Sequence, residues 1–191
     1  MLDRARRFVE ILFGEGTVSD ADPDDLFDIS TADVELELGG YESVDRAGLC
    51  FNQVESVDFD AVVTEIEEIL AASEVDSYTD YGVITDDYGY KWVRLEDPVF
   101  DDLVTLIHVA ADTLITSGYE NYLLCAVFAF EADVEVYWIY NFKRGAWYPF
   151  APVSEGTRAT AVEADVTDLM DAHLDLETDE SRQYPLWGIP F

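Results

Sequence analysis

The strongest constraint on the fold is an uninterrupted apolar run, YLLCAVFAF, at residues 122–130. The run has the length of a β-strand and is too short to span a membrane. A strand that is apolar on both sides belongs in the middle of a sheet with both faces covered. The next stretch, DVEVYWIYNF at 133–142, alternates and predicts a second strand, paired with the first through a turn at 131–133.

The segments on either side of this pair predict an α+β domain. Alternating patterns predict further strands in ADVELELGG (32–40), in AGLCFNQV (47–54) and in a hairpin over 81–96 that turns at 86–89. Apolar residues at helical spacing predict helices over 58–72 and 157–172. The terminal segment YPLWGIPF is too apolar to be left in water, so we expect it to pack on the domain.

One further helix has signals at both ends. Asp97 fits the N-cap, Pro98 the first helical position and Gly118 the residue after the end. We therefore expect a mainly antiparallel sheet with helices packed on one face, in the order β-β-α-β-β-α-β-β-β-α. Residues 1–23 are expected to form a short amphipathic helix and an acidic linker, and residues 24–191 a single α+β domain.

The chain is strongly acidic, with 42 Asp and Glu against 10 Lys and Arg and a formal net charge of -32. Because 49% of the residues are hydrophobic, this charge covers an ordinary core and does not indicate disorder. A surface almost without lysine is typical of proteins from salt-in halophiles, where molar salt reduces the Debye length to about 3 Å. Nucleic-acid binding is disfavoured, since phosphate contacts require clustered Arg and Lys.

No residue cluster predicts catalysis, so we expect a protein that is not an enzyme and has no cofactor. Cys50 and Cys125 lie in apolar segments and are expected to be reduced core residues of a cytoplasmic protein. His108 and His173 have no metal ligand at the usual spacing and are interpreted as structural. An enzyme or metal protein that uses His108, Cys125 or the acidic loop remains the alternative.

The acidic run DADPDD at 20–25 resembles the start of a calcium loop. The sixth position is Asp25 where the loop needs glycine, and the twelfth is Thr31 where it needs glutamate. We therefore expect a solvated acidic loop and no metal site.

The segment NFKRGAWYPF at 141–150 has two interpretations. Gly145 predicts a hairpin turn with the basic pair Lys143 and Arg144 at a solvated tip. The aromatic side chains that follow either pack within the sheet or form a protein-binding patch. The candidate partner-binding residues are Lys143, Arg144, Trp147, Tyr148 and Phe150, with Arg4, Arg7 and Phe8 of the N-terminal helix.

Several longer strings, read in order, resemble one protein family. They are DDLFDISTADVELELGG, GLCFNQVE, DYGYKW, DLVTLIHVAADTL, GYENYLLCAVFAF, YWIYNFKRGAWYPFAP and YPLWGIPF. In this order the strings resemble the PspA-associated protein PspAB family, over nearly the whole chain after residue 24. The resemblance implies a cytoplasmic partner of PspA, a membrane-associated coiled-coil protein of the phage-shock type of envelope stress response.

The resemblance implies no reaction and carries no catalytic residues. It predicts an adaptor or regulator that binds a PspA-like coiled-coil protein, with other PspA-associated proteins as further candidate partners. The protein is expected to reach the inner face of the membrane only through its partner. The alternative binding function is a small chaperone-like module that holds a peptide or helix on its sheet.

Overall fold

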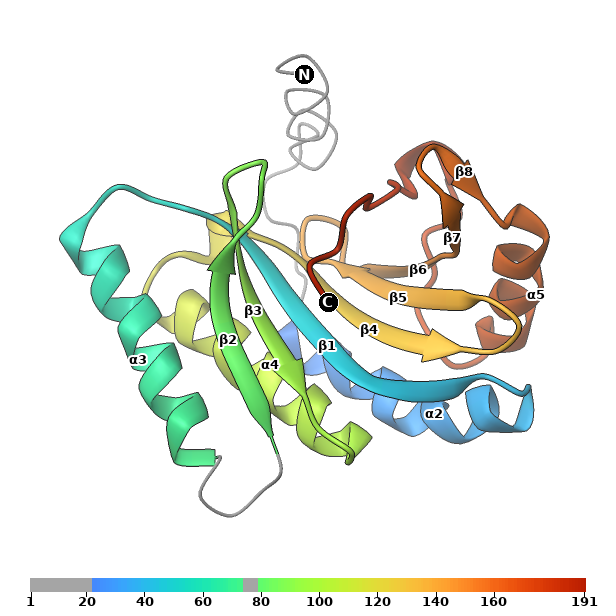
Figure 1. Ribbon diagram of the computed structural model, residues 1–191, viewed down its shortest axis with the longest axis horizontal. Helices are drawn as coiled ribbons and strands as arrows, with labels where there is room; N and C mark the ends of the chain where they lie inside the picture. Colours follow the sequence, from blue (N-terminus) through green and yellow to red (C-terminus); the bar gives the residue numbers. More distant parts are fainter. Residues whose placement is uncertain (1–21, 74–78) are drawn as a thin grey trace.

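A six-stranded antiparallel sheet forms the centre of the protein (Figure 1). The computed structural model describes residues 22–73 and 79–191, so the expected N-terminal helix and most of the linker lie outside the described residues. The strands are β1 Glu42–Asn52, β2 Asp80–Thr85, β3 Tyr90–Glu96, β4 Leu123–Glu131, β5 Glu135–Asn141 and β6 Ala146–Phe150, with a small second sheet of β7 Pro152–Ser154 and β8 Thr157–Arg158. The helices are η1 Pro23–Leu26, α2 Phe27–Leu38, α3 Val57–Ser73, α4 Phe100–Thr116 and α5 Thr160–Met170, with short 3₁₀ turns η2 Glu120–Tyr122 and η3 Glu180–Arg182.

The strand order across the large sheet is β2-β3-β1-β4-β5-β6. Strand β4 pairs with β1 on one side and β5 on the other, and residues 123–130 are all buried. The prediction that the apolar run forms a central strand is therefore confirmed, as is its pairing with the next strand.

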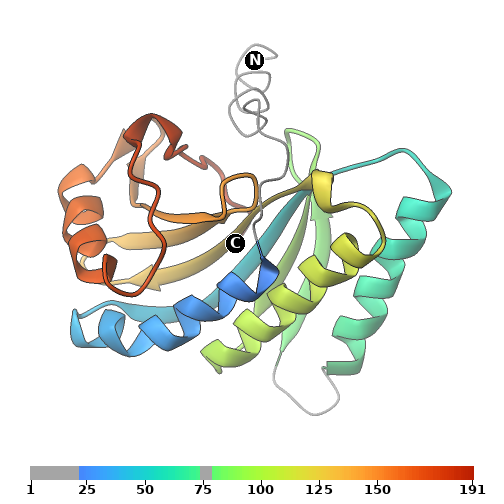
Figure 2. The same cartoon turned by 180° about the vertical axis from the view of Figure 1, so that it is seen from behind.

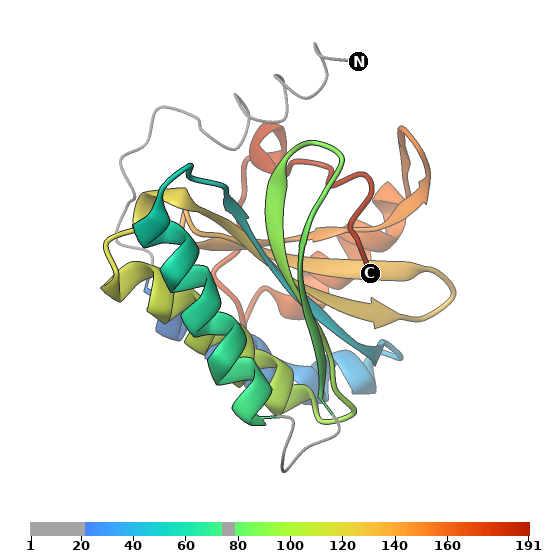
Figure 3. The same ribbon diagram turned by 60° about the vertical axis from the view of Figure 1, so that its left-hand side comes forward.

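The two faces of the sheet are covered by different parts of the chain. Helices α2 to α5 pack on one face, over a core that includes Phe51, Phe128 and Trp138. The other face is covered by the terminal segment from residue 184 to 191, which packs on Tyr90, Trp92 and their neighbours. Figure 3 shows the sheet with α3 and α4 on one side and the C-terminal segment on the other. The predicted α+β fold, its single helical face and the packing of the tail are confirmed.

The predicted strand at 32–40 is wrong, because these residues form the second half of helix α2 and the turn that follows it. Leu36 is buried in the core, whereas Val34 and Leu38 point outward with exposed fractions of 59% and 77%. Apolar residues on both sides of the helix produced the alternation that is typical of a strand. The helix ends at Gly39 and Gly40, and Gly40 has a φ of 85° that favours glycine.

The other elements follow the prediction, with one shifted boundary. The β2–β3 hairpin, helices α3 and α5 and strand β1 are confirmed, and Gly118 after α4 has a positive φ of 82°. Helix α4 begins at Phe100 and not at Pro98, so Asp97 is not its N-cap. Asp97 instead accepts hydrogen bonds from the Val99 N–H at 2.8 Å and from the Thr79 hydroxyl, which fixes the turn before the helix.

The turn between β5 and β6 is a hairpin, but its tip is only partly solvated. Gly145 adopts a φ of 61°, and its N–H donates to the Asn141 carbonyl at 2.9 Å, which confirms the role predicted for the glycine. Lys143 is only 9% exposed, and its Nζ donates to the Asn121 carbonyl at 2.7 Å. The expected solvated position is therefore wrong for Lys143, because this side chain folds back to anchor the segment before β4.

Candidate functional site

The aromatic residues proposed as partner anchors lie inside the protein. Trp147, Tyr148 and Phe150 of β6 are at most 1% exposed. Trp147 packs on Tyr140, with ring centroids 5.1 Å apart, on the helical side of the sheet, and the other two lie on the opposite side. Packing within the sheet is thus the interpretation that the structure confirms for these three side chains. Arg144 is half-buried, and Arg4, Arg7 and Phe8 lie outside the described residues.

The outer edge of β6 is also covered. The backbone N–H of Trp147 donates to the Asp175 carbonyl at 2.8 Å, and the backbone N–H of Glu177 donates to the Trp147 carbonyl at 2.8 Å. This short parallel bridge occupies backbone groups that an edge strand would otherwise offer to another chain. The hairpin region is therefore closed by the protein's own C-terminal third.

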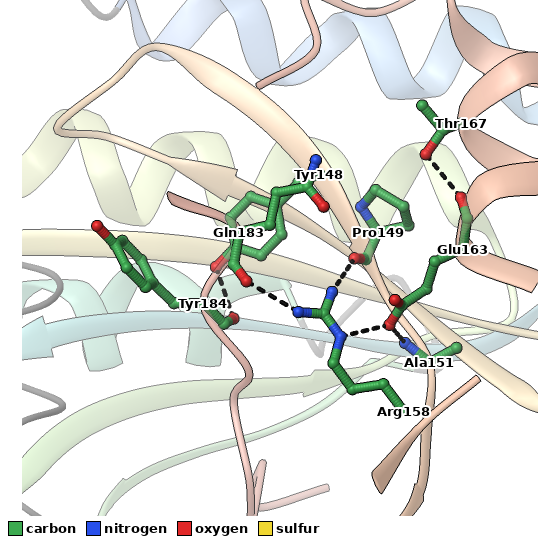
Figure 4. A network of polar contacts seen from close by, with 8 residues as sticks. All are labelled: Tyr148, Pro149, Ala151, Arg158, Glu163, Thr167, Gln183 and Tyr184. Carbon is green, nitrogen blue, oxygen red and sulfur yellow. Dashed lines mark hydrogen bonds and ion pairs between the residues drawn. The ribbon is translucent and has the colours of Figure 1, made fainter. Parts of the chain in front are cut away.

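The most extensive polar network in this part of the molecule is centred on Arg158 (Figure 4). Its Nε donates to Glu163 Oε1 at 2.8 Å, and its two terminal nitrogens donate to the Gln183 carbonyl at 2.9 Å and the Pro149 carbonyl at 3.3 Å. Glu163 Oε1 also accepts from the Ala151 N–H at 2.7 Å. The network joins β6, β8 and α5 to Gln183, the residue just before the terminal segment, so its geometry serves to hold these parts together.

Sequence analysis did not single out Arg158 as a residue that holds segments together. The available signal was weak: Arg158 is one of only ten basic residues and lies just before the predicted last helix. Beside this network, α5 and residues 176–183 line a groove of about 460 Å³ that contains several acidic side chains. Within residues 22–73 and 79–191, no three His, Cys, Asp or Glu side chains come together as a metal site would require.

The two cysteines face each other beneath the terminal segment. Cys50 of β1 and Cys125 of β4 are directly opposite in the antiparallel pairing, and both are free thiols with no exposed surface. Burial raises the pKa of the Cys50 thiol well above its ordinary value, and the neighbouring Cys125 adds to this effect. A buried protonated thiol is a poor nucleophile, so the interpretation of both residues as core cysteines agrees with the geometry.

His108 has a structural position. Its Nε2 lies 2.9 Å from Asp24 Oδ1, and its ring packs on Phe27 with centroids 4.7 Å apart. These contacts join α4 to η1 and the start of α2. His173 is exposed after α5 and is distant in sequence from the elements that hold His108.

An open groove lies between α2, the start of β1 and the start of α4. It has a volume of about 710 Å³. Its apolar lining comes from Leu38, Pro98, Val99 and Phe100, and its acidic lining from Asp33, Glu37, Glu42 and Asp45. Leu38 and Val99 are exposed there, and no basic side chain among the described residues lines it. Sequence analysis missed this surface because it assigned residues 32–40 to a strand.

Asp33 is the most unusual group in the groove. Its Oδ1 is buried and has no hydrogen-bond partner among the described residues. Burial raises the pKa of the Asp33 carboxyl, and the charges of Glu37 and Asp101 raise it further. Asp101 itself accepts a hydrogen bond from the Ser30 hydroxyl, which links α2 to α4. The groove thus combines apolar surface with concentrated negative charge that no basic residue of its described lining offsets.

Comparison with known proteins places the chain in a family. Among the described residues, no helix has both the length and the apolar character needed to cross a bilayer. Neither a curated protein nor a solved structure matches the chain. The family model of PspA associated protein B (PspAB) matches residues 6–191. This match covers nearly the whole sequence and agrees with the resemblance of its strings, and the chain therefore belongs to the PspAB family.

Proposed function

We propose that the protein is a non-enzymatic adaptor or regulator that associates with a PspA-type coiled-coil protein during a phage-shock-type envelope stress response. The observation that carries the proposal is the family match over residues 6–191, because the family's name, PspA associated protein B, indicates a link to PspA. In this proposal the protein works in the cytoplasm and reaches the membrane through its partner. Its acidic surface is adapted to concentrated salt.

The geometry supports an adaptor more than a peptide-holding chaperone. One face of the sheet is filled by helices and the other by residues 184–191, so a peptide would have to displace part of the core to lie on the sheet. The groove beside α2 is open without any rearrangement and carries exposed apolar side chains. Contact through an existing outer surface is the simpler way to bind a folded partner.

The test is affinity capture of the tagged protein from its host, in multimolar potassium chloride, before and after membrane stress. Mass spectrometry of the captured material is expected to show enrichment of a PspA-type coiled-coil protein. An Arg144→Ala variant tests whether the exposed part of the hairpin tip contributes to capture. Absence of that protein in both states would contradict the proposal, and capture of many unrelated unfolded chains would favour the chaperone alternative.

A further inference from the structure

We propose that the outward face of helix α2 is a docking surface for a coiled-coil type helix whose apolar stripe is flanked by Lys and Arg. The inference rests on the proposed function and deepens it, because it names the surface and the chemistry of the partner helix. Helix α2 lies beside α4 at the front of the helical layer in Figure 2.

The outward residues of α2 have the spacing of a coiled-coil stripe. Phe27, Thr31, Val34 and Leu38 follow one another at intervals of four, three and four residues. With about 3.6 residues per turn, these positions fall on one side of the helix. Val34 and Leu38 are exposed to 59% and 77%, and Phe27, whose ring also packs on His108 of α4, is exposed to 39%. The spacing equals successive d and a positions of a heptad repeat.

The opposite side of α2 is committed to the core. Ile29, Ala32 and Leu36 are fully buried against α4 and the sheet. The helix is therefore apolar on two opposite sides, and only one of them is needed to hold it in the fold. A surface helix of a globular domain normally has one apolar stripe, so the second stripe requires another explanation. A second helix that covers Val34 and Leu38 would explain this stripe.

Charge on α2 identifies the kind of helix that fits. If Val34 occupies a d position, the flanking e positions are Asp28 and Glu35, and the following g position is Glu37. None of these acids forms an ion pair with a described residue. Burial and the neighbouring Asp25 and Asp175 charges raise the pKa of Asp28, as expected where negative charge lacks a counterion. Within a packed helix pair, where partly buried charges are screened much less by salt than exposed ones, Lys or Arg at the flanking positions of a partner would compensate these acids, and Glu there would repel them.

The apolar stripe continues into the groove at the end of α2. Leu38 belongs both to the stripe and to the groove lining, where Val99 and Phe100 extend the apolar surface. Helix α2 alone has 12 residues and offers only three turns. The groove lengthens the contact and places Asp33, with its buried unpaired oxygen, beside the path of a partner helix. A contact limited to about three helical turns and the adjoining groove suits reversible association.

The occupant is a partner helix and not a second copy of the chain. In a symmetric pair, the acids beside the stripe of one copy would face the same acids of the other, and like charges across a helix pair oppose association. The chain's own amino-terminal segment carries Arg4, Arg6 and Arg7 and is the competing occupant that the experiment has to separate.

The experiment measures binding of the full-length protein to synthetic peptides of about four heptads with Leu at a and d. One peptide carries Lys at e and g, and its sister carries Glu. We expect the basic peptide to bind and the acidic peptide not to bind. A Val34→Lys, Leu38→Lys double variant should weaken binding of the basic peptide by at least about tenfold.

Matched variants separate the surface from general effects of charge. Val153 has nearly the same exposed fraction as Val34, 61% against 59%, but it lies on β7. Val153→Lys should therefore leave the affinity for the basic peptide within about twofold. A Glu35→Lys, Glu37→Lys variant should reverse the preference toward the acidic peptide. Equal binding of both peptides, or undiminished binding by the Val34 and Leu38 double variant, would overturn the proposal.

Two further outcomes assign the face to other occupants and also overturn the proposal. Binding of the basic peptide only after Arg4, Arg6 and Arg7 are changed to Glu would assign the face to the amino-terminal segment. A native dimer that becomes monomeric in the Val34 and Leu38 double variant would assign it to a second copy.

Capture from the host separates this inference from the proposed function. If the double variant captures the PspA-type protein as well as the native chain does, the docking surface is wrong and the proposed function stands. If the native chain binds the basic peptide but captures no PspA-type protein, the proposed function fails and the property of α2 stands.

Discussion

The β5–β6 hairpin and helix α2 are opposite cases of how composition relates to exposure. The hairpin is rich in aromatic and basic residues, features of many interfaces, yet its aromatic rings and Lys143 are buried. Helix α2 alternates acids with aliphatic residues, a pattern that suggested a half-buried strand, yet it exposes Val34 and Leu38. In this protein, the aromatic residues of the hairpin belong to the core that the fold needs. The exposed aliphatic residues of α2 lie on a surface that is available for contact.

The largest effect is expected at Trp147. Replacement by alanine removes a buried ring that packs on Tyr140 and Phe128, and Trp→Ala changes in a core cost about 3–5 kcal/mol. Denaturant unfolding in concentrated potassium chloride measures the loss of free energy of unfolding. Leu38→Ala is the control from α2 and should change stability by no more than about 0.5 kcal/mol. A similar cost at both positions would break the contrast between the two regions.

The next effect is expected at Arg158, which joins the hairpin to Gln183, the residue just before the terminal segment. Arg158→Ala leaves the buried Glu163 carboxylate without its cation and leaves the Gln183 and Pro149 carbonyls without a donor. Breaking a largely buried ion pair in this way costs about 3 kcal/mol. Arg158→Lys keeps the charge but not the three directions of donation, and should recover only part of the loss. Full recovery by lysine would mean that charge alone matters at this position.

A smaller effect is expected at the hairpin turn. Gly145 has a φ of 61°, so Gly145→Ala should destabilise the protein by about 1 kcal/mol through backbone strain. Gly82 of β2 is the control, because a Cβ there would meet only the end of the Arg94 side chain at 3.9 Å. Gly82→Ala should therefore carry no comparable cost. Thermal unfolding of both variants checks the difference.

Much of the fold could be predicted from local patterns, and the errors have physical causes. The run at 122–130 and the glycine after α4 each carry their own structural signal, and both are confirmed. Residues 32–40 were assigned wrongly because a helix that is apolar on two sides has the same alternation as a strand.

The candidate site was harder to predict than the elements. Arg158 joins residues 149, 163 and 183, and the groove joins α2 to residues 98–100, so both depend on how distant segments pack. The burial of Lys143 likewise depends on a carbonyl 22 residues away in the sequence. Such contacts have no signal in any short stretch. A local conflict between pattern and structure, as in α2, is nevertheless a useful indicator of a surface kept for another purpose.

The smallest effect is expected at Asp33, and its sign distinguishes α2 from the hairpin. Because the pKa of Asp33 in the folded protein is raised above its ordinary value of 3.8, the folded state holds this proton more tightly than the unfolded state. Stability should therefore fall as pH rises through the window from 3.8 to the raised pKa, and the cost persists at neutral pH.

Asp33→Asn removes this titration, so the variant should be more stable than the native chain at neutral pH, with an advantage that shrinks as the pH is lowered through that window. Unfolding of both proteins over a pH series gives the difference directly, and a difference that does not change with pH would contradict the assignment of uncompensated charge to α2. If α2 carries charge that folding does not require, Asp33→Asn should stabilise the protein, whereas the substitutions in the hairpin destabilise it.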